Sequence, residues 1–308
     1  MPRLTRILLL CLSVFLFSSP SYGATQYPLT VIDGQGQSLT LESRPESISS
    51  LTLFTDEILL NLIDRKAIKS MTFLASDPVF SNVADQVPQD MKLIDMNVEA
   101  IIQMYPDIAF VANWSDAGKV EQLRQAGIPV YLIDTPVTLE SIEAEILKIA
   151  HILDVADKGQ QLVADMQARL AFSAADFQKL SARHWTVLDY NTWGTASGKG
   201  TTWNEVVEHA GLINGVAKYE VGDYGQVDLS KEMIVSINPD VLFLPGWIYG
   251  DPEGADKFKN EVLNDPALAD VAAIKNNRLY SMPENLRGTF SHYIVDAIRF
   301  VNAAVQSQ

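Results

Sequence analysis

Short apolar runs alternate with amphipathic segments along the whole chain. The apolar run at residues 130–133 is typical of a strand that is buried in a parallel sheet, and strands are also predicted at residues 47–51 and 67–73. The segments at 117–126 and 139–153 predict helices, and Gly127 supplies a stop signal after the first of them. Alternation of strand and helix predicts an α/β fold with parallel sheets.

The second half of the chain repeats this alternation. A strand at residues 186–190 precedes a glycine-rich loop, for which we predict a flexible segment beside a cleft, and a helix at residues 203–210. We further predict a helical stretch at 266–274, a strand at 278–281 and a final helix at 291–305.

A long helix is predicted between the two halves. Residues 155–182 contain no proline and a single glycine near their start, with apolar residues such as Leu162, Met166 and Leu170 at helical spacing. About 28 residues at 1.5 Å each reach roughly 42 Å, enough to cross between two lobes. The alternative is a helix packed wholly on one lobe.

A fifteen-residue phrase occurs twice, 133 residues apart. Residues 97–111 read NVEAIIQMYPDIAFV and residues 230–244 read SKEMIVSINPDVLFL. In each copy a cap residue opens a short helix, a glutamate (Glu99 or Glu232) lies in the first turn, and a proline precedes an apolar strand. This spacing indicates duplicated halves rather than a solenoid repeat.

These patterns predict two α/β lobes with parallel sheets, joined by one long helix, with a partner that is gripped between the lobes or docked across them. The boundaries we expect are an N-terminal lobe at 24–154, an interlobe helix at 155–182 and a C-terminal lobe at 183–308.

Residues 1–23 have the features of a cleavable export signal. Two arginines precede an apolar stretch at residues 7–17, which is too short to span a bilayer, and small residues follow it at 21–23. Cys11, the only cysteine, lies inside this stretch, so the mature protein is expected to have neither disulfide nor thiol chemistry. We predict an exported, periplasmic protein.

The charge balance excludes several partners. The net charge is −15, and removal of the export segment with Arg3 and Arg6 would make it two units more negative. Such a charge argues against binding to nucleic acid or to anionic membrane surfaces.

The loops that follow the predicted strands are rich in aromatic residues. Since the loops after parallel strands border the binding crevice of an open sheet, these residues are candidates for a ligand cleft. The alternative is that they are core or lobe-surface aromatics. The candidates in these loops are Asn113, Trp114, Tyr190, Trp193, Trp247 and Tyr249. Tyr224, a few residues before the second copy of the repeated phrase, is a further candidate.

Catalytic and metal-binding motifs are poorly supported. The four histidines lie far apart without ligand spacing, which argues against direct capture of a free metal ion. The glycine-rich segment 194–201 has three residues between its first glycine and the Gly-Lys pair, whereas a phosphate-binding loop needs four. There is no nucleophile elbow. We therefore expect no catalytic residue, resident metal or cofactor, although an exported enzyme on the same scaffold stays the alternative.

Several stretches together carry a family resemblance over nearly the whole mature chain. They are RPESISSLTLFTDEILLNLI, NVEAIIQMYPDIAFVA, LRQAGIPVYLID, TASGKGTTWNEVVEHAGLINGVA, LSKEMIVSINPDVLFLPG and VAAIKNNRLYSMP. In this order the chain resembles the periplasmic binding proteins of ABC importers for iron–siderophore, haem and cobalamin. The resemblance implies two lobes on a stiff helix with the ligand between them.

The resemblance also implies roles for individual residues. Glu99 and Glu232 would dock onto arginines of the membrane permease, although a carboxylate at a helix start also has a purely structural explanation. Arg287, in the loop after residues 279–282, would contact ligand, the alternative being a solvated arginine. Lys199 and His292 have weaker support, and Tyr190, Tyr224 or Tyr249 would be the choices for coordinating haem iron.

The resemblance implies a monomer that hands a small-molecule metal chelate to an ABC permease and its ATPase subunits at the inner membrane. Arg287 and Lys199 are the only basic residues among these candidates, and so little positive charge favours a weakly charged chelate. An iron–siderophore, such as a hydroxamate chelate, is the first expectation, with a corrinoid or haem as the alternative.

Overall fold

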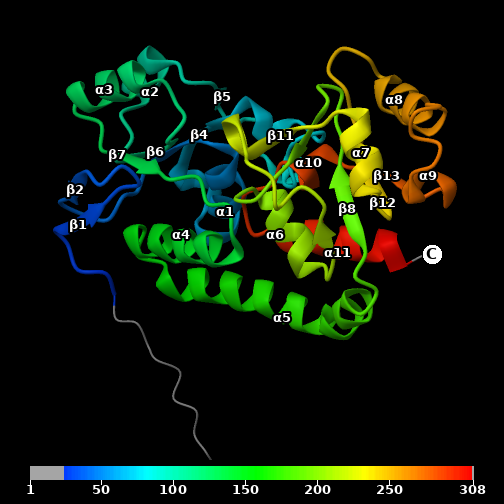
Figure 1. Ribbon diagram of the computed structural model, residues 1–308. Coiled ribbons are helices and arrows are strands. Elements are labelled where there is room, and N and C mark those ends of the chain that lie inside the picture. The colour runs from blue at the N-terminus through cyan, green and yellow to red at the C-terminus, as the bar shows by residue number, and fades with distance from the viewer. Residues whose placement is uncertain (1–23, 307–308) are drawn as a thin grey trace, which may run out of the picture.

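The computed structural model describes residues 24–306, so the predicted export segment lies outside the described residues. Two parallel sheets lie side by side, each with helices packed around it (Figure 1). The first sheet has the strand order β5-β4-β3-β6-β7, and the second has the order β10-β8-β12-β13. No helix between residues 24 and 306 has both the length and the apolar character that crossing a membrane requires.

The first sheet is formed by strands between residues 48 and 133. Its strands are β3 (Ile48–Leu51), β4 (Ile68–Thr72), β5 (Leu93–Ile94), β6 (Ile108–Ala112) and β7 (Val130–Ile133). Strands β3, β6 and β7 are buried along their whole length, which explains the continuous apolar runs of β6 and β7, whereas β3 carries two buried serines, Ser49 and Ser50. The associated helices are α1 (Leu53–Leu62), α2 (Val98–Met104), α3 (Ala117–Gln125) and α4 (Leu139–Ile152), and a hairpin of β1 (Leu29–Ile32) and β2 (Ser38–Leu41) precedes them.

The second sheet contains β8 (Thr186–Asp189), β10 (Ile213–Asn214), β12 (Val241–Pro245) and β13 (Leu279–Met282). Its helices are α6 (Thr202–His209), α7 (Lys231–Ile237), α8 (Gly254–Leu263), α9 (Ala272–Lys275), α10 (Glu284–Arg287) and α11 (Ile294–Gln306). A small antiparallel pair, β9 (Thr195–Ser197) with β11 (Gln226–Asp228), stands apart from this sheet.

The two copies of the repeated phrase have matching structures. Asn97 and Ser230 cap α2 and α7 through side-chain oxygens that accept from the amides three residues later. Asp107 exchanges hydrogen bonds with the backbone of Ser47 at the start of β3, and Asp240 does the same with Thr186 at the start of β8. Each copy therefore anchors its own strand to the central strand of its sheet, as expected for duplicated halves.

The long helix α5 (Ala156–Ser181) runs along one side of both sheets (Figure 1). It packs against α4 at one end and α11 at the other. The predicted helix extends one residue further at each end, whereas the domain boundaries themselves stay a prediction.

One hydrophobic cluster is continuous between the lobes. It joins residues of α1, α4, α5, α6 and α11, among them Ile58, Ile146, Met166, Val206 and Ile298. Two further clusters are local, one within each lobe. The lobes are thus connected by a shared core at their base as well as by α5.

Two local predictions differ from the structure. Only α9 is helical in the stretch predicted at 266–274, and the residues before it form successive turns. Asp265 accepts a hydrogen bond from the amide of Ala267 there, and such local side-chain bonds compete with helix formation. The glycine-rich loop at 194–201 contains strand β9, because its residues pair with β11 in a segment distant in sequence.

Candidate functional site

Two adjoining chambers lie between the lobes and share part of their walls. The first, called here the polar chamber, has a volume of about 460 Å³ and the second, the apolar chamber, about 370 Å³. Glu284, Gly288 and Phe290 line both chambers. The segment 284–290, which begins with α10, therefore forms a common floor.

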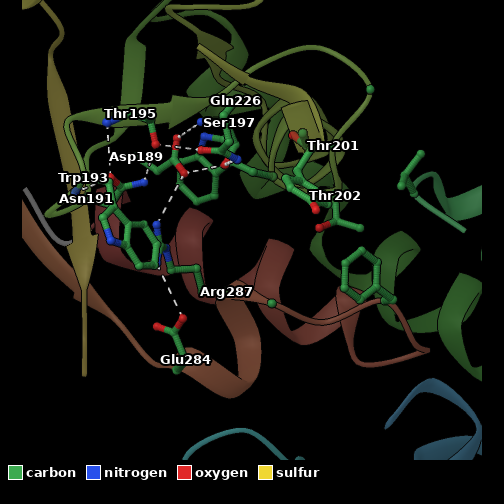
Figure 2. A pocket seen from close by; sticks show the side chains of 16 residues that line it. Asp189, Asn191, Trp193, Thr195, Ser197, Thr201, Thr202, Gln226, Glu284 and Arg287 are labelled. Carbon is green, nitrogen blue, oxygen red and sulfur yellow. Dashed lines mark hydrogen bonds and ion pairs between the residues drawn. The ribbon is translucent and has the colours of Figure 1, made fainter. Parts of the chain in front are cut away.

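The polar chamber is built mainly by the second lobe (Figure 2). Hydroxyl, amide and aromatic side chains surround it, together with two carboxylates and one guanidinium. Its lining residues are Val137, Asp189, Asn191, Trp193, Thr195, Ser197, Gly200, Thr201, Thr202, Trp203, Tyr224, Gln226, Glu284, Arg287, Gly288 and Phe290.

Arg287 lies between two carboxylates in this chamber (Figure 2). One of its terminal nitrogens is 3.8 Å from Asp189 Oδ2, and the other is 3.5 Å from Glu284 Oε1. Burial raises the pKa of Asp189, and the nearby Arg287 and hydrogen bonds from Ser197 oppose that rise. Burial likewise raises the pKa of Glu284, with Arg287 acting in the opposite direction. The single guanidinium is therefore already compensated by protein carboxyl groups.

A network of hydrogen bonds fixes the chamber wall that faces Asp189, Glu284 and Arg287. Asn191 Oδ1 accepts from the backbone amides of Trp193 and Thr195, and its amide nitrogen donates to Thr195 Oγ1. Thr195 Oγ1 donates to Gln226 Oε1, and Gln226 donates in turn to Ser197 Oγ. These bonds hold β9 and β11 together and leave the Trp193 ring 84% exposed beside the chamber.

The apolar chamber is built by the first lobe. It contains few polar groups, and Phe73 and Trp114 keep 57% and 70% of their surface exposed. Large exposed aromatic rings are costly in water, so these rings provide a surface that a ligand could cover. The lining residues are Leu51, Thr52, Leu53, Phe54, Thr72, Phe73, Leu74, Phe80, Asp95, Met96, Trp114, Ser115, Thr135, Glu284, Gly288 and Phe290.

Four of the eight residues predicted to bind ligand line a chamber. Trp114 lines the apolar chamber, whereas Trp193, Tyr224 and Arg287 line the polar chamber. Tyr224 is 93% exposed and stands with φ 55°, in the left-handed region that non-glycine residues rarely occupy.

The other four, Asn113, Tyr190, Trp247 and Tyr249, line neither chamber. Asn113 donates to Asp134 and accepts from Thr135, which does line the apolar chamber. The Tyr190 ring packs against Phe258, with the two centroids 5.6 Å apart.

Trp247 and Tyr249 complete this group. The Trp247 ring meets Phe80 of the first lobe edge-on at 5.1 Å, and Tyr249 is 89% exposed beside Trp247.

The weaker candidates are also absent from both linings. Lys199 is exposed. His292 is buried, and desolvation, together with the charge of Arg169, lowers its pKa to about 4. Within residues 24–306 no group of three His, Cys, Asp or Glu side chains is arranged to hold a metal ion.

Glu99 and Glu232 occupy equivalent positions outside the chambers. Each is exposed in the first turn of its helix, α2 or α7. Hydrogen bonds at the start of α7, from its own amide and from Ser230, lower the pKa of Glu232. Helices α2 and α7 lie on the side of the molecule away from α5, one on each lobe (Figure 1).

Apart from Arg287, sequence reasoning missed the floor and much of both walls. Asp189 is the last residue of β8, so the strand-end rule that identified Tyr190 also applied to it. Glu284 and Phe290 surround Arg287 in sequence, but nothing in the sequence separates a floor residue from a solvated one there. Phe73 and Phe80 lie in a loop whose course depends on tertiary packing.

Comparison with known proteins gives one matching family and several relatives. A profile described as "Periplasmic binding protein" matches residues 48–286. A cobalamin-binding protein of Halobacterium salinarum is 26% identical over 224 residues, which are 71% of this chain and 59% of that relative. The molybdate-binding protein MolA of Haemophilus influenzae is 25% identical over 283 residues, covering 83% of this chain and 75% of MolA.

Solved structures share the fold. The haem-binding protein HmuT superimposes with a TM-score of 0.71 at 17% identity, covering 92% of each chain. At this identity the likeness concerns the fold alone.

Proposed function

The chain belongs to the periplasmic binding protein family, and we propose that it captures a large, weakly charged metal chelate and delivers it to the permease of an ABC importer. The observation that carries this proposal is the two-chambered cleft, with one polar and one apolar side and a charge-compensated floor.

The size of the cleft supports a chelate rather than a small ion. The two chambers adjoin, and their volumes of about 460 and 370 Å³ together reach the upper part of the range of small-molecule sites, roughly 300–1,000 Å³. A tetrahedral oxyanion such as molybdate would fill only a small part of this space. A ligand with a polar periphery and a broad apolar face would contact both sides.

The charge of the cleft limits the charge of the ligand. Arg287 is the only lysine or arginine among the lining residues, and Asp189 and Glu284 flank it. A highly anionic chelate would meet two carboxyl groups without a free cation, which is unfavourable in a partly desolvated site. Haem, with its two carboxylates, fits less well for the same reason.

A corrinoid is the ligand that best matches these features. Its periphery carries uncharged amides, which hydroxyl and amide side chains such as Thr195, Ser197 and Gln226 can bind, and its ring offers a face for Trp114 and Phe73. The cobalamin-binding relative supports the same choice. An iron–hydroxamate siderophore, which is also weakly charged, is the second candidate.

Delivery to the permease would use the N-terminal ends of α2 and α7, which carry Glu99 and Glu232. Glu99 and Glu232 are exposed in the first turns of α2 and α7, and these helices lie on the side of the molecule away from α5, one on each lobe (Figure 1). A pair of arginines on a permease would match the two glutamates, giving orientation and charge complementarity more than affinity.

Titration of the purified protein with four compounds tests the ligand class. We expect tight binding of cyanocobalamin or of iron(III)-ferrichrome by calorimetry, and no binding of haemin or molybdate at comparable concentrations. Tight binding of molybdate, with neither chelate bound, would contradict the proposal.

A further inference from the structure

The floor segment 284–290 belongs to the second lobe in sequence, but hydrogen bonds attach it to the first lobe. Helix α10 follows β13 of the second lobe, yet Asn285 exchanges two hydrogen bonds with Asn82 of the first lobe. Asn82 Nδ2 donates to the Asn285 carbonyl at 2.9 Å, and Asn285 Nδ2 donates to Asn82 Oδ1 at 3.0 Å. This reciprocal pair links residues that are 203 positions apart.

A buried carboxyl group orients Asn82. Glu57 of α1 is only 2% exposed, and its Oε1 accepts from the backbone amide of Asn82 at 2.9 Å and from Nδ2 at 2.8 Å. Its Oε2 accepts from the hydroxyl of Ser291, which lies just beyond the floor segment. Glu57 therefore connects to the second lobe through Ser291 and, by way of Asn82, through Asn285.

Helix α10 cannot define its own position. It has four residues and makes one turn of backbone hydrogen bonds, from Leu286, Arg287 and Gly288 to the carbonyls of Pro283 and Glu284. Isolated helices of this length are unstable in water, so tertiary contacts must hold it. On the second-lobe side, the charged contact of Arg287 with Asp189 is long, at 3.8 Å.

We propose that Asn82, oriented by Glu57, is a positioning residue for ligand binding: it fixes α10 so that Glu284 and Arg287 keep their places on the floor of both chambers. This inference rests on the proposed function, because it assumes that the chambers hold the ligand. Asn82, a first-lobe residue outside the lining, thus controls Glu284 and Arg287, which the second lobe presents to the ligand.

Hydrogen exchange of the ligand-free protein tests the attachment directly. The variants are Asn82→Ala and Asn285→Ala, with Asn61→Ala as the matched control, because Asn61 makes its side-chain hydrogen bond within α1. We expect amides of residues 286–288 to exchange about tenfold faster in the first two variants, while those of β8 and α5 keep their rates. The control should leave all three regions unchanged.

A thermodynamic cycle separates positioning from general destabilisation. With cyanocobalamin and iron(III)-ferrichrome as probes, we expect Asn82→Ala to weaken binding about tenfold. In an Arg287→Ala background the same substitution should weaken binding by clearly less than tenfold, because Glu284 is then the only charged side chain that α10 positions. A merely structural role would give the same loss in both backgrounds.

The outcomes are distinct. Unchanged exchange in α10, or equal affinity losses with and without Arg287, would overturn the positioning role. If the unsubstituted protein bound neither probe, the proposed ligand class would fail, and exchange alone would decide: faster exchange in α10 would support the attachment, and unchanged exchange would refute it.

Discussion

The guanidinium of Arg287 lies 3.8 Å from the carboxyl group of Asp189, and both side chains are largely removed from water. Asp189 also accepts hydrogen bonds from the amide and the hydroxyl of Ser197. The family resemblance implied that Arg287 contacts the ligand. The structure also surrounds it with protein carboxyl groups, so its role includes balancing the charge of Asp189 and Glu284.

Loss of Arg287 should therefore destabilise the protein. Arg287→Ala leaves Asp189 buried without a cation, and we expect a loss of about 2 kcal/mol in the free energy of unfolding. This lies below the roughly 3–5 kcal/mol of fully buried pairs, since the Arg287 side chain keeps 17% of its exposure and the contact is long. Urea unfolding measures the change.

The double variant Asp189→Asn/Arg287→Ala is the control for this prediction. Removing both charges should recover most of the loss, because the Asp189 position, the more deeply buried of the two carboxyl groups beside Arg287, no longer carries a charge without a cation. Equal stabilities of the single and double variants would contradict a charge-balancing role.

A second prediction concerns Asp56, which lies buried in the first turn of α1. Burial raises its pKa to about 8, despite opposing hydrogen bonds from Ser50 and Thr72. Between about pH 4 and 8 the folded protein thus holds a proton that the unfolded chain has released. The free energy of unfolding should consequently fall as pH rises, by at most about 1.4 kcal/mol per unit.

Asp56→Asn should make this fall shallower, because the amide imitates the protonated acid. Only the other buried carboxyl groups with raised pKa values, Glu57, Asp189 and Glu284, would then contribute. His292, whose pKa is lowered from 6.5 to about 4, acts with the opposite sign between those values. Urea unfolding from pH 6.5 to 8 avoids the titration of His292, and the difference between the profiles of the variant and the unsubstituted protein there measures the contribution of Asp56. Identical pH profiles for the variant and the unsubstituted protein would show that Asp56 is ionised in the fold.

How much of this site the sequence could predict depends on what fixes each residue. Glu99 and Glu232, with their capping residues, follow from local rules and a duplicated phrase, and the structure has them at equivalent helix starts. The strand ends likewise follow from apolar runs. These features depend on neighbours within a few positions in the sequence.

The floor depends on contacts that no local rule contains. Asn82 and Asn285 form their hydrogen bonds only because the two lobes pack together. Phe290 lines both chambers because the segment that contains α10 forms their common floor. The aromatic-loop rule also selected Tyr249 along with Trp114, since both follow strands. Which of them borders a chamber is decided by the course of each loop in space.

The aromatic residues give a third prediction. Trp114→Ala and Trp193→Ala should each weaken binding of cyanocobalamin about tenfold, because each removes a ring that borders a chamber. Their stability should change by less than about 0.5 kcal/mol, since both rings are already exposed. Tyr249→Ala is the matched control, an exposed ring outside both linings, and an equal loss there would contradict the assignment of the chambers.

Limited closure of the cleft is the fourth prediction. Helix α5 packs along both lobes, a common hydrophobic cluster joins their bases, and Arg169 of α5 forms an ion pair with Asp296 of α11. Lobes that are joined by flexible crossovers with hinges can rotate by large angles, whereas the packed connection of this protein restricts such a rotation. Small-angle scattering with and without cyanocobalamin should give radii of gyration that agree within error. A clear contraction would rule out the stiff connection.

The last prediction concerns the exposed glutamates on α2 and α7. Glu99→Lys with Glu232→Lys should abolish uptake of radiolabelled cyanocobalamin by cells that carry this protein and its own permease, because both docking charges would become repulsive. Affinity of the purified variant should stay unchanged, since neither residue lines a chamber. Glu121→Lys with Glu208→Lys reverses two other exposed charges and is the matched control. Uptake that survives the first pair, or fails equally with the second, would refute a specific docking role for Glu99 and Glu232.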